Sequence, residues 1–214
     1  MIADRSPTKA FTVFELLITI VVLMVVAAIL LPALTPAHTC QRINCTNNMK
    51  QIGLSFRTWA LDNEDHLPMQ VAGTIGGTRE LTAQGMVFPS FQVMSNELST
   101  PKVLICPQDV KRHSATNFGP DLSDQKLSYF LCQDPSESGT PGVLIGDRNL
   151  TNLLVPGKHY VAFTTQLSLG WTKELHSQQG NVGFTDGSVG QFKNGGLCVR
   201  RKGPQVQTNR LLVP

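Results

Sequence analysis

The strongest pattern in the chain is an uninterrupted apolar run near its N-terminus. Residues 16–34 contain no charged side chain, which makes 19 consecutive uncharged positions. At about 1.5 Å per residue, a helix of this length spans roughly 28 Å, close to the thickness of the hydrocarbon core of a bilayer. The cationic Arg5 and Lys9 precede the run and favour a cytoplasmic N-terminus. The pattern predicts one membrane-spanning helix, with the bulk of the chain on the other side of the membrane.

A second hydrophobic pattern follows this run. Apolar residues recur at intervals of four, three, four and three, which is the period of one helix face. The residues of this stripe are Cys45, Met49, Ile52, Phe56 and Trp59. We expect one long interrupted helix over residues 12–62, with a kink or melted turn over 31–37, where Pro32 and Pro36 lie. Its second half should be amphipathic and pack on a globular head through the stripe.

The rest of the chain is loop-rich and carries short strand patterns. A short helix is expected at about 90–98. Three apolar runs have the length of strands, namely 102–106, 127–134 and 142–147. The clearest hairpin is 181–192, where Asp186 and Gly187 form a two-residue turn in which both take a positive φ. Antiparallel strands after a long helix predict an α+β fold, with the helix packed on a small antiparallel sheet.

Composition narrows the class of function. Charged residues make up 15% of the chain, below the usual ~25%, which suits a chain that lies partly in a membrane. The net charge is +3 without a basic block, so no specific nucleic-acid binding is indicated. The five cysteines are Cys40, Cys45, Cys106, Cys132 and Cys198. They form no C-x-x-C pair, so the local spacing of a zinc site is absent, and their disulfide pairing stays open.

Glu15, at the front edge of the apolar run, helps to decide what the N-terminal segment is. A cleaved secretory signal has an apolar core of about 7–15 residues, shorter than this run. A lipoprotein signal needs a small residue before its cysteine, whereas Cys40 follows Thr39. A plain anchor fits the length but gives no reason for Glu15, because an ionisable residue costs about 2.5–3.5 kcal/mol at the centre of a spanning helix. Near a helix end, snorkelling toward the headgroups reduces that cost.

Residues 9–17, KAFTVFELL, resemble the processing site of type IV pilin-like precursors. In that family a prepilin peptidase removes a short basic leader, the new N-terminal Phe is methylated, and a Glu stands fifth in the mature chain. The resemblance implies a cut between Ala10 and Phe11, which makes Glu15 the fifth residue. The family prefers Gly before the cut, where this chain has Ala10. Pro32 is the twenty-second residue after the cut, where pilin helices commonly carry a kink-forming proline.

The resemblance continues along the chain. The similar blocks are CTNNMKQIGL (45–54), VLICPQD (103–109), GDRN (146–149) and an H-x9-D-G pattern from His176 to Gly187. Such blocks occur in bacterial proteins of the type II secretion pseudopilin family that carry a prepilin-type N-terminal cleavage/methylation segment. The resemblance therefore implies a pilin-like fold and a structural subunit of a type II secretion or type IV pilus-like filament, rather than an enzyme.

The resemblance also implies an organisation and a set of partners. Residues 1–10 are the leader, 11–37 the transmembrane or filament-core helix, and 38–214 the head. The precursor would cross the bacterial inner membrane once, with its leader in the cytoplasm and its head outside. The partners are the prepilin peptidase, the assembly machinery and identical subunits of the filament. Glu15 is the expected assembly contact, because pairing it with the amine of Phe11 on a neighbouring subunit lowers the cost of burying either charge.

No cofactor is expected, and the sequence shows no G-x-S-x-G, H-E-x-x-H or phosphate-loop motif. Some related pseudopilins bind calcium, and Asp147 and Asp186 are the nearest carboxylates here. Calcium needs six to eight oxygen ligands, however, and the chain has no dense acidic loop. Two other functions stay open. One is a membrane-anchored minor pilin-like module that binds a surface ligand, and the other is an anchored enzyme with a polar pocket that gathers His176, Asp147 and Asp186.

Overall fold

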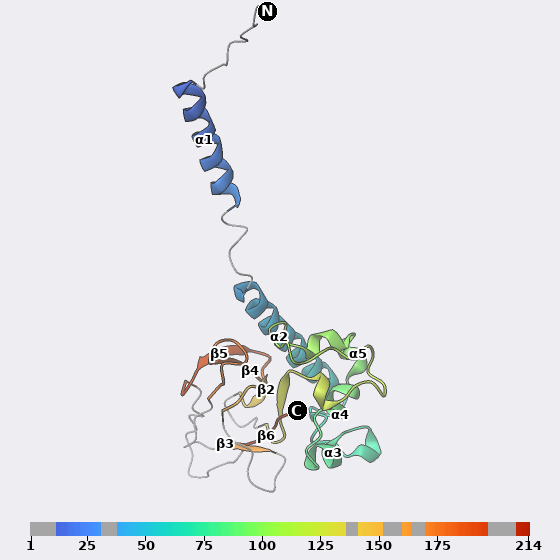
Figure 1. Ribbon diagram of the computed structural model, residues 1–214. Helices are drawn as coiled ribbons and strands as arrows, with labels where there is room; N and C mark the ends of the chain where they lie inside the picture. Colours follow the sequence, from blue (N-terminus) through green and yellow to red (C-terminus); the bar gives the residue numbers. More distant parts are fainter. Residues whose placement is uncertain (1–11, 31–37, 136–140, 152–159, 164–169, 197–208) are drawn as a thin grey trace, which may run out of the picture. The chain divides into compact units, whose positions relative to one another are not determined.

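The computed structural model divides the chain into two compact units, Met1–Ala37 and His38–Pro214 (Figure 1). The border coincides with the expected end of the membrane segment. The structure describes residues 12–30, 38–135, 141–151, 160–163, 170–196 and 209–214. The expected cut between Ala10 and Phe11 and the expected kink at Pro32 lie outside these residues.

The first unit contains helix α1 (Val13–Leu30). Its 18 residues include no proline or glycine, and at 1.5 Å per residue they extend over about 27 Å. Every side chain of the helix is exposed within this chain. Of the described part of the chain, α1 is the one helix that is long and apolar enough to cross a membrane, as the sequence predicts.

The second unit contains one antiparallel sheet in the order β3-β6-β1-β2-β4-β5. The strands are β1 (Tyr129–Cys132), β2 (Val143–Asp147), β3 (Val161–Phe163), β4 (Gln179–Phe184), β5 (Val189–Lys193) and β6 (Asn209–Leu212). The expected strands at 127–134 and 142–147 are confirmed as β1 and β2, and both are buried along their whole length. The expected hairpin is confirmed as β4 and β5.

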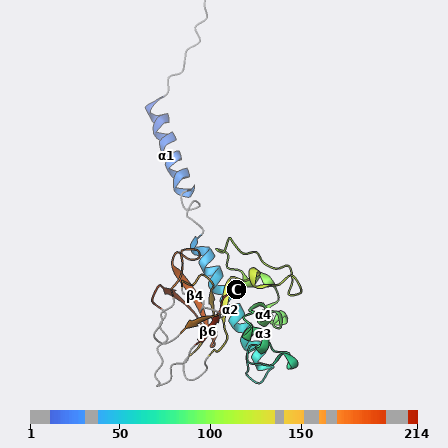
Figure 2. The same cartoon turned by 60° about the horizontal axis from the view of Figure 1, so that its bottom comes forward.

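Helix α2 (His38–Leu61) packs on this sheet through β2, β4 and β5. The predicted apolar stripe is confirmed as the buried face, since Cys45, Met49, Ile52 and Phe56 are fully buried and Trp59 is nearly so. On its other side, α2 contacts the short helices. These are η2 (Gly73–Ile75), α3 (Arg79–Ala83), α4 (Phe88–Gln92), α5 (Ser95–Leu98), η3 (Pro101–Leu104) and η4 (Asp124–Lys126). Of these, α5 and η3 lie along α2, and α4 contacts it through Phe91. Figures 1 and 2 both show α2 between the sheet and this group.

Two expected elements take another form. The strand expected at 102–106 is wrong, because this segment begins with the 3-10 helix η3. Pro101 stands at its first position and the Thr100 hydroxyl accepts a hydrogen bond from the backbone of Lys102. The single helix expected at 90–98 is divided into α4 and α5. A short apolar run is compatible with either a buried helical turn or a strand. Here Pro101 at the first helical position and Thr100 as the N-cap favour the helical turn.

The hairpin turn also differs from the expected one. Phe184 and Ser188 close a three-residue loop, with Phe184 N donating to Ser188 O at 2.9 Å. Only Gly187 takes a positive φ, of 82°, whereas Asp186 does not. The loop is therefore a turn followed by a left-handed glycine, and not the predicted two-residue turn.

The buried face of α2 generates a first prediction. Phe56 is fully buried and lies edge-on to Phe91, with ring centroids 5.9 Å apart. Replacing Phe56 with Ala should lower the free energy of unfolding by about 3–5 kcal/mol, because it removes apolar contacts and leaves a cavity. Leu54→Ala, on the exposed face of the same helix, should change it by less than about 0.5 kcal/mol.

The measurement is denaturant unfolding of the detergent-solubilised protein, followed by the fluorescence of the buried Trp59 and Trp171. Equal losses for both variants would contradict the assignment of the buried face.

Candidate functional site

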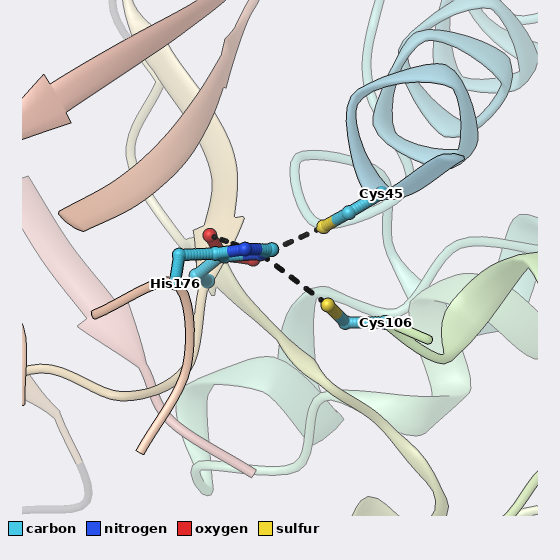
Figure 3. A group of neighbouring side chains, drawn as sticks. Cys45, Cys106 and His176 are labelled. Atoms are coloured by element: carbon cyan, nitrogen blue, oxygen red, sulfur yellow. Dashed lines mark hydrogen bonds and ion pairs between the residues drawn. The ribbon is translucent and has the colours of Figure 1, made fainter. Parts of the chain in front are cut away.

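Four buried side chains from four separate segments meet inside the head (Figure 3). Cys45 comes from α2, Cys106 from the residues after η3, Asp147 from the end of β2, and His176 from the segment before β4. One sulfur, nitrogen or oxygen atom from each residue lies within 4.8 Å of the other three. Figure 3 shows Cys45, Cys106 and His176 pointing toward one another.

The shortest contacts link the four groups in a chain. His176 Nε2 lies 3.4 Å from Cys106 Sγ and 3.4 Å from Asp147 Oδ2. The Cys45 thiol donates to Asp147 Oδ1 at 3.4 Å. His176 Nδ1 is buried and makes no hydrogen bond to a described residue, so the polar contacts of the ring pass through Nε2.

Backbone and amide donors fix the carboxylate of this group. Asn181 donates to Asp147 Oδ2 from its backbone at 2.6 Å and from Nδ2 at 3.0 Å. The same Nδ2 lies 3.5 Å from Cys45 Sγ. The Tyr129 hydroxyl also lies 3.5 Å from that sulfur. Asp147 and Cys45 are therefore held in place by groups that carry no charge.

An ion-pair network frames the cluster from outside. Arg148, which follows Asp147, donates to the two oxygens of Asp109 at 2.7 and 2.9 Å and to Glu174 at 2.6 Å. Asp109 is three residues after Cys106, and Glu174 is two residues before His176. The network thus ties together three of the four segments that supply the cluster.

The segment that carries His176 has an unusual backbone. His176, Ser177 and Gln178 have φ values of 52°, 54° and 64°, so three consecutive residues other than glycine are left-handed. This conformation costs roughly 1–2 kcal/mol per residue and persists only where the surroundings impose it. Here Arg42 donates to His176 O at 3.0 Å, and Asn149 Nδ2 donates to Leu175 O at 3.1 Å. Strain of this kind concentrates at functional sites.

The cluster holds three acidic groups and one imidazole, and the neighbouring Arg42 donates to His176 O and Gln179 Oε1 rather than to these acids. Burial raises the pKa of Asp147 to about 7. The neighbouring Cys45 thiol lowers the pKa of Cys106 to about 5, and the proximity of the two thiols together with burial raises the pKa of Cys45. In the described ranges, no lysine or arginine side chain forms an ion pair with these acids, because Arg148 is turned to Asp109 and Glu174.

This geometry does not suit nucleophilic catalysis. In a Cys-His-acid triad, the acid binds the ring nitrogen opposite the one that faces the nucleophile. Here Asp147 and Cys106 both face Nε2 of His176. Both sulfur atoms also belong to fully buried residues, which a substrate cannot reach. The donor set of two thiols, one imidazole and one carboxylate matches instead the ligand types of a metal ion.

The residues singled out from the sequence fall in different places. His176 and Asp147 are brought together, but Asp186 is exposed in the β4–β5 turn, where its Oδ1 accepts from Ser188 N and Oγ at 2.9 and 2.6 Å. Calcium at Asp147 and Asp186 stays a prediction that gains no support from their placement. The two cysteines of the cluster were missed because they lie far apart in the chain. Each of the four residues does, however, lie in one of the four blocks that carry the family resemblance.

The other predicted site residue, Glu15, lies in the first turn of α1. Its Oε2 accepts hydrogen bonds from Thr12 N and Thr12 Oγ1, both at 2.9 Å, and Glu15 N donates to Thr12 Oγ1 at 3.3 Å. This reciprocal T-x-x-E arrangement is a capping box, which the sequence-based prediction missed. Oε1 makes no hydrogen bond to a described residue, so Glu15 keeps an oxygen available beyond its local role.

No protein-family model, curated protein or solved structure matches this chain.

The Asp109–Arg148 pair generates a second prediction. Burial alone would raise the pKa of Asp109, but hydrogen bonds from Arg148 and Ser128 lower it below its usual value. Asp109→Asn should reduce the free energy of unfolding by about 3–5 kcal/mol, because it removes the buried carboxylate that pairs with both ends of the largely buried Arg148 guanidinium and leaves it only Glu174. Asp134→Asn is the matched control, since Asp134 and Arg210 form the same two-bond pair with both side chains about 40% exposed. It should cost about 0–1 kcal/mol.

Denaturant unfolding as a function of pH measures both effects. A depressed pKa means that the contribution of Asp109 is complete above its unfolded-state value, near about 4, and is lost as the pH falls through the folded value. The Asp109→Asn protein should lack this part of the acid dependence. An unchanged acid profile would refute the role of the pair.

Proposed function

We propose that this chain is a structural subunit of a type II secretion or type IV pilus-like filament, processed between Ala10 and Phe11. The observation that carries the proposal is helix α1, an apolar helix with a carboxylate in its first turn. Phe14 and Ile29, near its two ends, are each at least 70% exposed within one chain. Such a helix requires either lipid or other helices around it, because water is an unfavourable environment for so much apolar surface.

Glu15 distinguishes the filament from a plain anchor. Its capping bonds use Oε2 and turn the carboxylate toward Thr12, which is the residue after Phe11. Cleavage would place a positive amine on Phe11. In a bundle of these helices, Oε1 of Glu15 would accept that amine from a neighbouring subunit, and the pair would fix the stagger between helices. Each charge would be costly in the apolar bundle without the other.

The head supports the same proposal. A helix that follows the membrane segment in the sequence, here α2, and packs its apolar stripe on an antiparallel sheet is the arrangement expected of a pilin-like head. In this proposal the precursor crosses the inner membrane once with the leader in the cytoplasm. The prepilin peptidase and the assembly machinery supply the chemistry, and the subunit contributes packing surfaces.

Glu15 has two possible roles, capping the helix and supplying a charge, and different variants can separate them. This generates a third prediction. Glu15→Gln keeps an acceptor for the Thr12 capping bonds but removes the charge. If the carboxylate neutralises an amine, Glu15→Gln and Glu15→Ala should both insert into the membrane and both fail to enter filaments. Thr12→Val, which loses the hydroxyl of the cap and keeps the charge, should still assemble.

Membrane fractionation and the yield of sheared filaments measure these outcomes. Normal assembly of Glu15→Gln with loss of assembly in Glu15→Ala would mean that Glu15 serves the helix cap alone, and would rule out charge pairing as its role.

A fourth prediction concerns processing. Intact-mass and N-terminal peptide analysis should show a mature chain that begins with methylated Phe11 in cells with the prepilin peptidase, and a full-length chain in cells without it. Ala10→Gly should raise the processed fraction. A leader retained in both strains, or a cut after Ala37, would overturn the proposed function.

A further inference from the structure

We propose that Cys45, Cys106, Asp147 and His176 bind one zinc ion, which fastens α2 to the sheet of the head. The site lies in the second unit and does not depend on filament assembly. The proposal rests on the convergence of four buried side chains, each with one metal-binding atom within 4.8 Å of the other three.

The separations between these atoms fit a tetrahedral ion. With Zn–S bonds of about 2.3 Å and Zn–N or Zn–O bonds of about 2.0–2.2 Å, neighbouring ligand atoms in a tetrahedron lie about 3.3–3.8 Å apart. Cys106 Sγ and His176 Nε2 are 3.4 Å apart, and Asp147 is 3.4 Å from His176 Nε2 through Oδ2 and 3.4 Å from Cys45 Sγ through Oδ1. The others are below 4.8 Å, so side-chain adjustments of about 1 Å would complete the tetrahedron.

The negative charge that the cluster carries when its thiols are deprotonated favours the binding of a cation. Two thiolates and a carboxylate in a buried site require positive charge, since uncompensated buried charges are strongly unfavourable. No described lysine or arginine forms an ion pair with these groups, and within the cluster Arg42 reaches only the backbone oxygen of His176. A divalent ion would take the place of the two thiol protons, which pass to solvent, and would be coordinated by both sulfurs, the carboxylate and the neutral imidazole. Asn181 would remain as the donor to Asp147 and to Cys45.

The donor types favour zinc over calcium and magnesium. Both of those ions prefer oxygen, and this cluster offers a single carboxylate, whereas thiolate and imidazole together are typical of zinc. A disulfide between Cys45 and Cys106 would use only the sulfurs and would leave Asp147 and His176 buried against each other. Both cysteines are free thiols in the structure. Four protein ligands without an open position describe a structural site rather than a catalytic one.

Zinc would also account for the backbone before β4. The left-handed residues 176–178 turn the imidazole into the cluster, and a metal bond would provide the constraint that keeps this conformation. By linking α2, the segment after η3, β2 and the segment before β4, one ion would close three long loops of the chain. Such closure stabilises the folded state by reducing the entropy of the unfolded chain.

The test uses the full-length chain, purified in detergent under reducing conditions without chelators. Elemental analysis by mass spectrometry should find about one zinc per chain. After chelation and titration with Co²⁺, the protein should show the intense visible bands of a tetrahedral ion and the near-ultraviolet thiolate-to-cobalt transition. With zinc at about 1,000 times its Kd, the midpoint of thermal unfolding should rise by roughly 10 °C over the chelated protein.

Variants then assign the ligands. Cys45→Ser and Cys106→Ser should each weaken cobalt binding by more than about 100-fold and reduce the thiolate transition. Cys132→Ser is the matched control, because Cys132 is an equally buried free thiol outside the cluster, and it should bind cobalt as the parent does. His176→Cys should retain binding, with a stronger thiolate transition from its third sulfur.

The wild-type protein decides the proposal even if a serine variant does not fold. Absence of zinc together with absence of a tetrahedral cobalt spectrum would overturn it. A Cys45–Cys106 disulfide in the protein isolated with free thiols alkylated would overturn it as well, as would equal loss of binding in Cys132→Ser. None of these results would alter the processing or assembly experiments, which concern the first unit.

Discussion

Burial of one face of α2 is the interaction on which the head depends. A single stripe from Cys45 to Trp59 packs against both the sheet and the short helices. The same stripe carries a polar atom into the interior, because Cys45 belongs both to the apolar face and to the cluster with Asp147. Cys45 therefore belongs both to the apolar core and to the polar cluster, and a substitution at this residue would disturb both.

The parts of this fold that could be predicted from the sequence are those encoded in neighbouring residues. The stripe of α2, strands β1 and β2 and the β4–β5 hairpin each follow from a local period or turn signal. Segment 102–106 shows the limit of that reasoning, since its apolar residues are equally compatible with a strand and with a buried 3-10 turn. Strands β3 and β6 gave no such signal, because each is short and is defined mainly by the partner it meets.

The candidate sites divide along the same line. Glu15 stands out because one charge interrupts an apolar run, yet the sequence-based prediction gave it a partner on another chain and missed Thr12, only three residues away. The cluster of Cys45, Cys106, Asp147 and His176 could not be found by spacing, because its members are far apart in the chain and come together only in the folded head. Their membership in four separate motif blocks was the one sequence signal that linked them.

The position of β6 has a consequence for how the head acquires its shape. Strand β3 pairs with β6 and with no other described strand, and β6 joins it to β1. Both flanking strands precede β6 in the sequence, so each has an unpaired edge until residues 209–212 are added to the sheet. The last described strand in the chain is therefore an internal strand of the sheet, so β3 cannot be joined to β1 until β6 is in place between them.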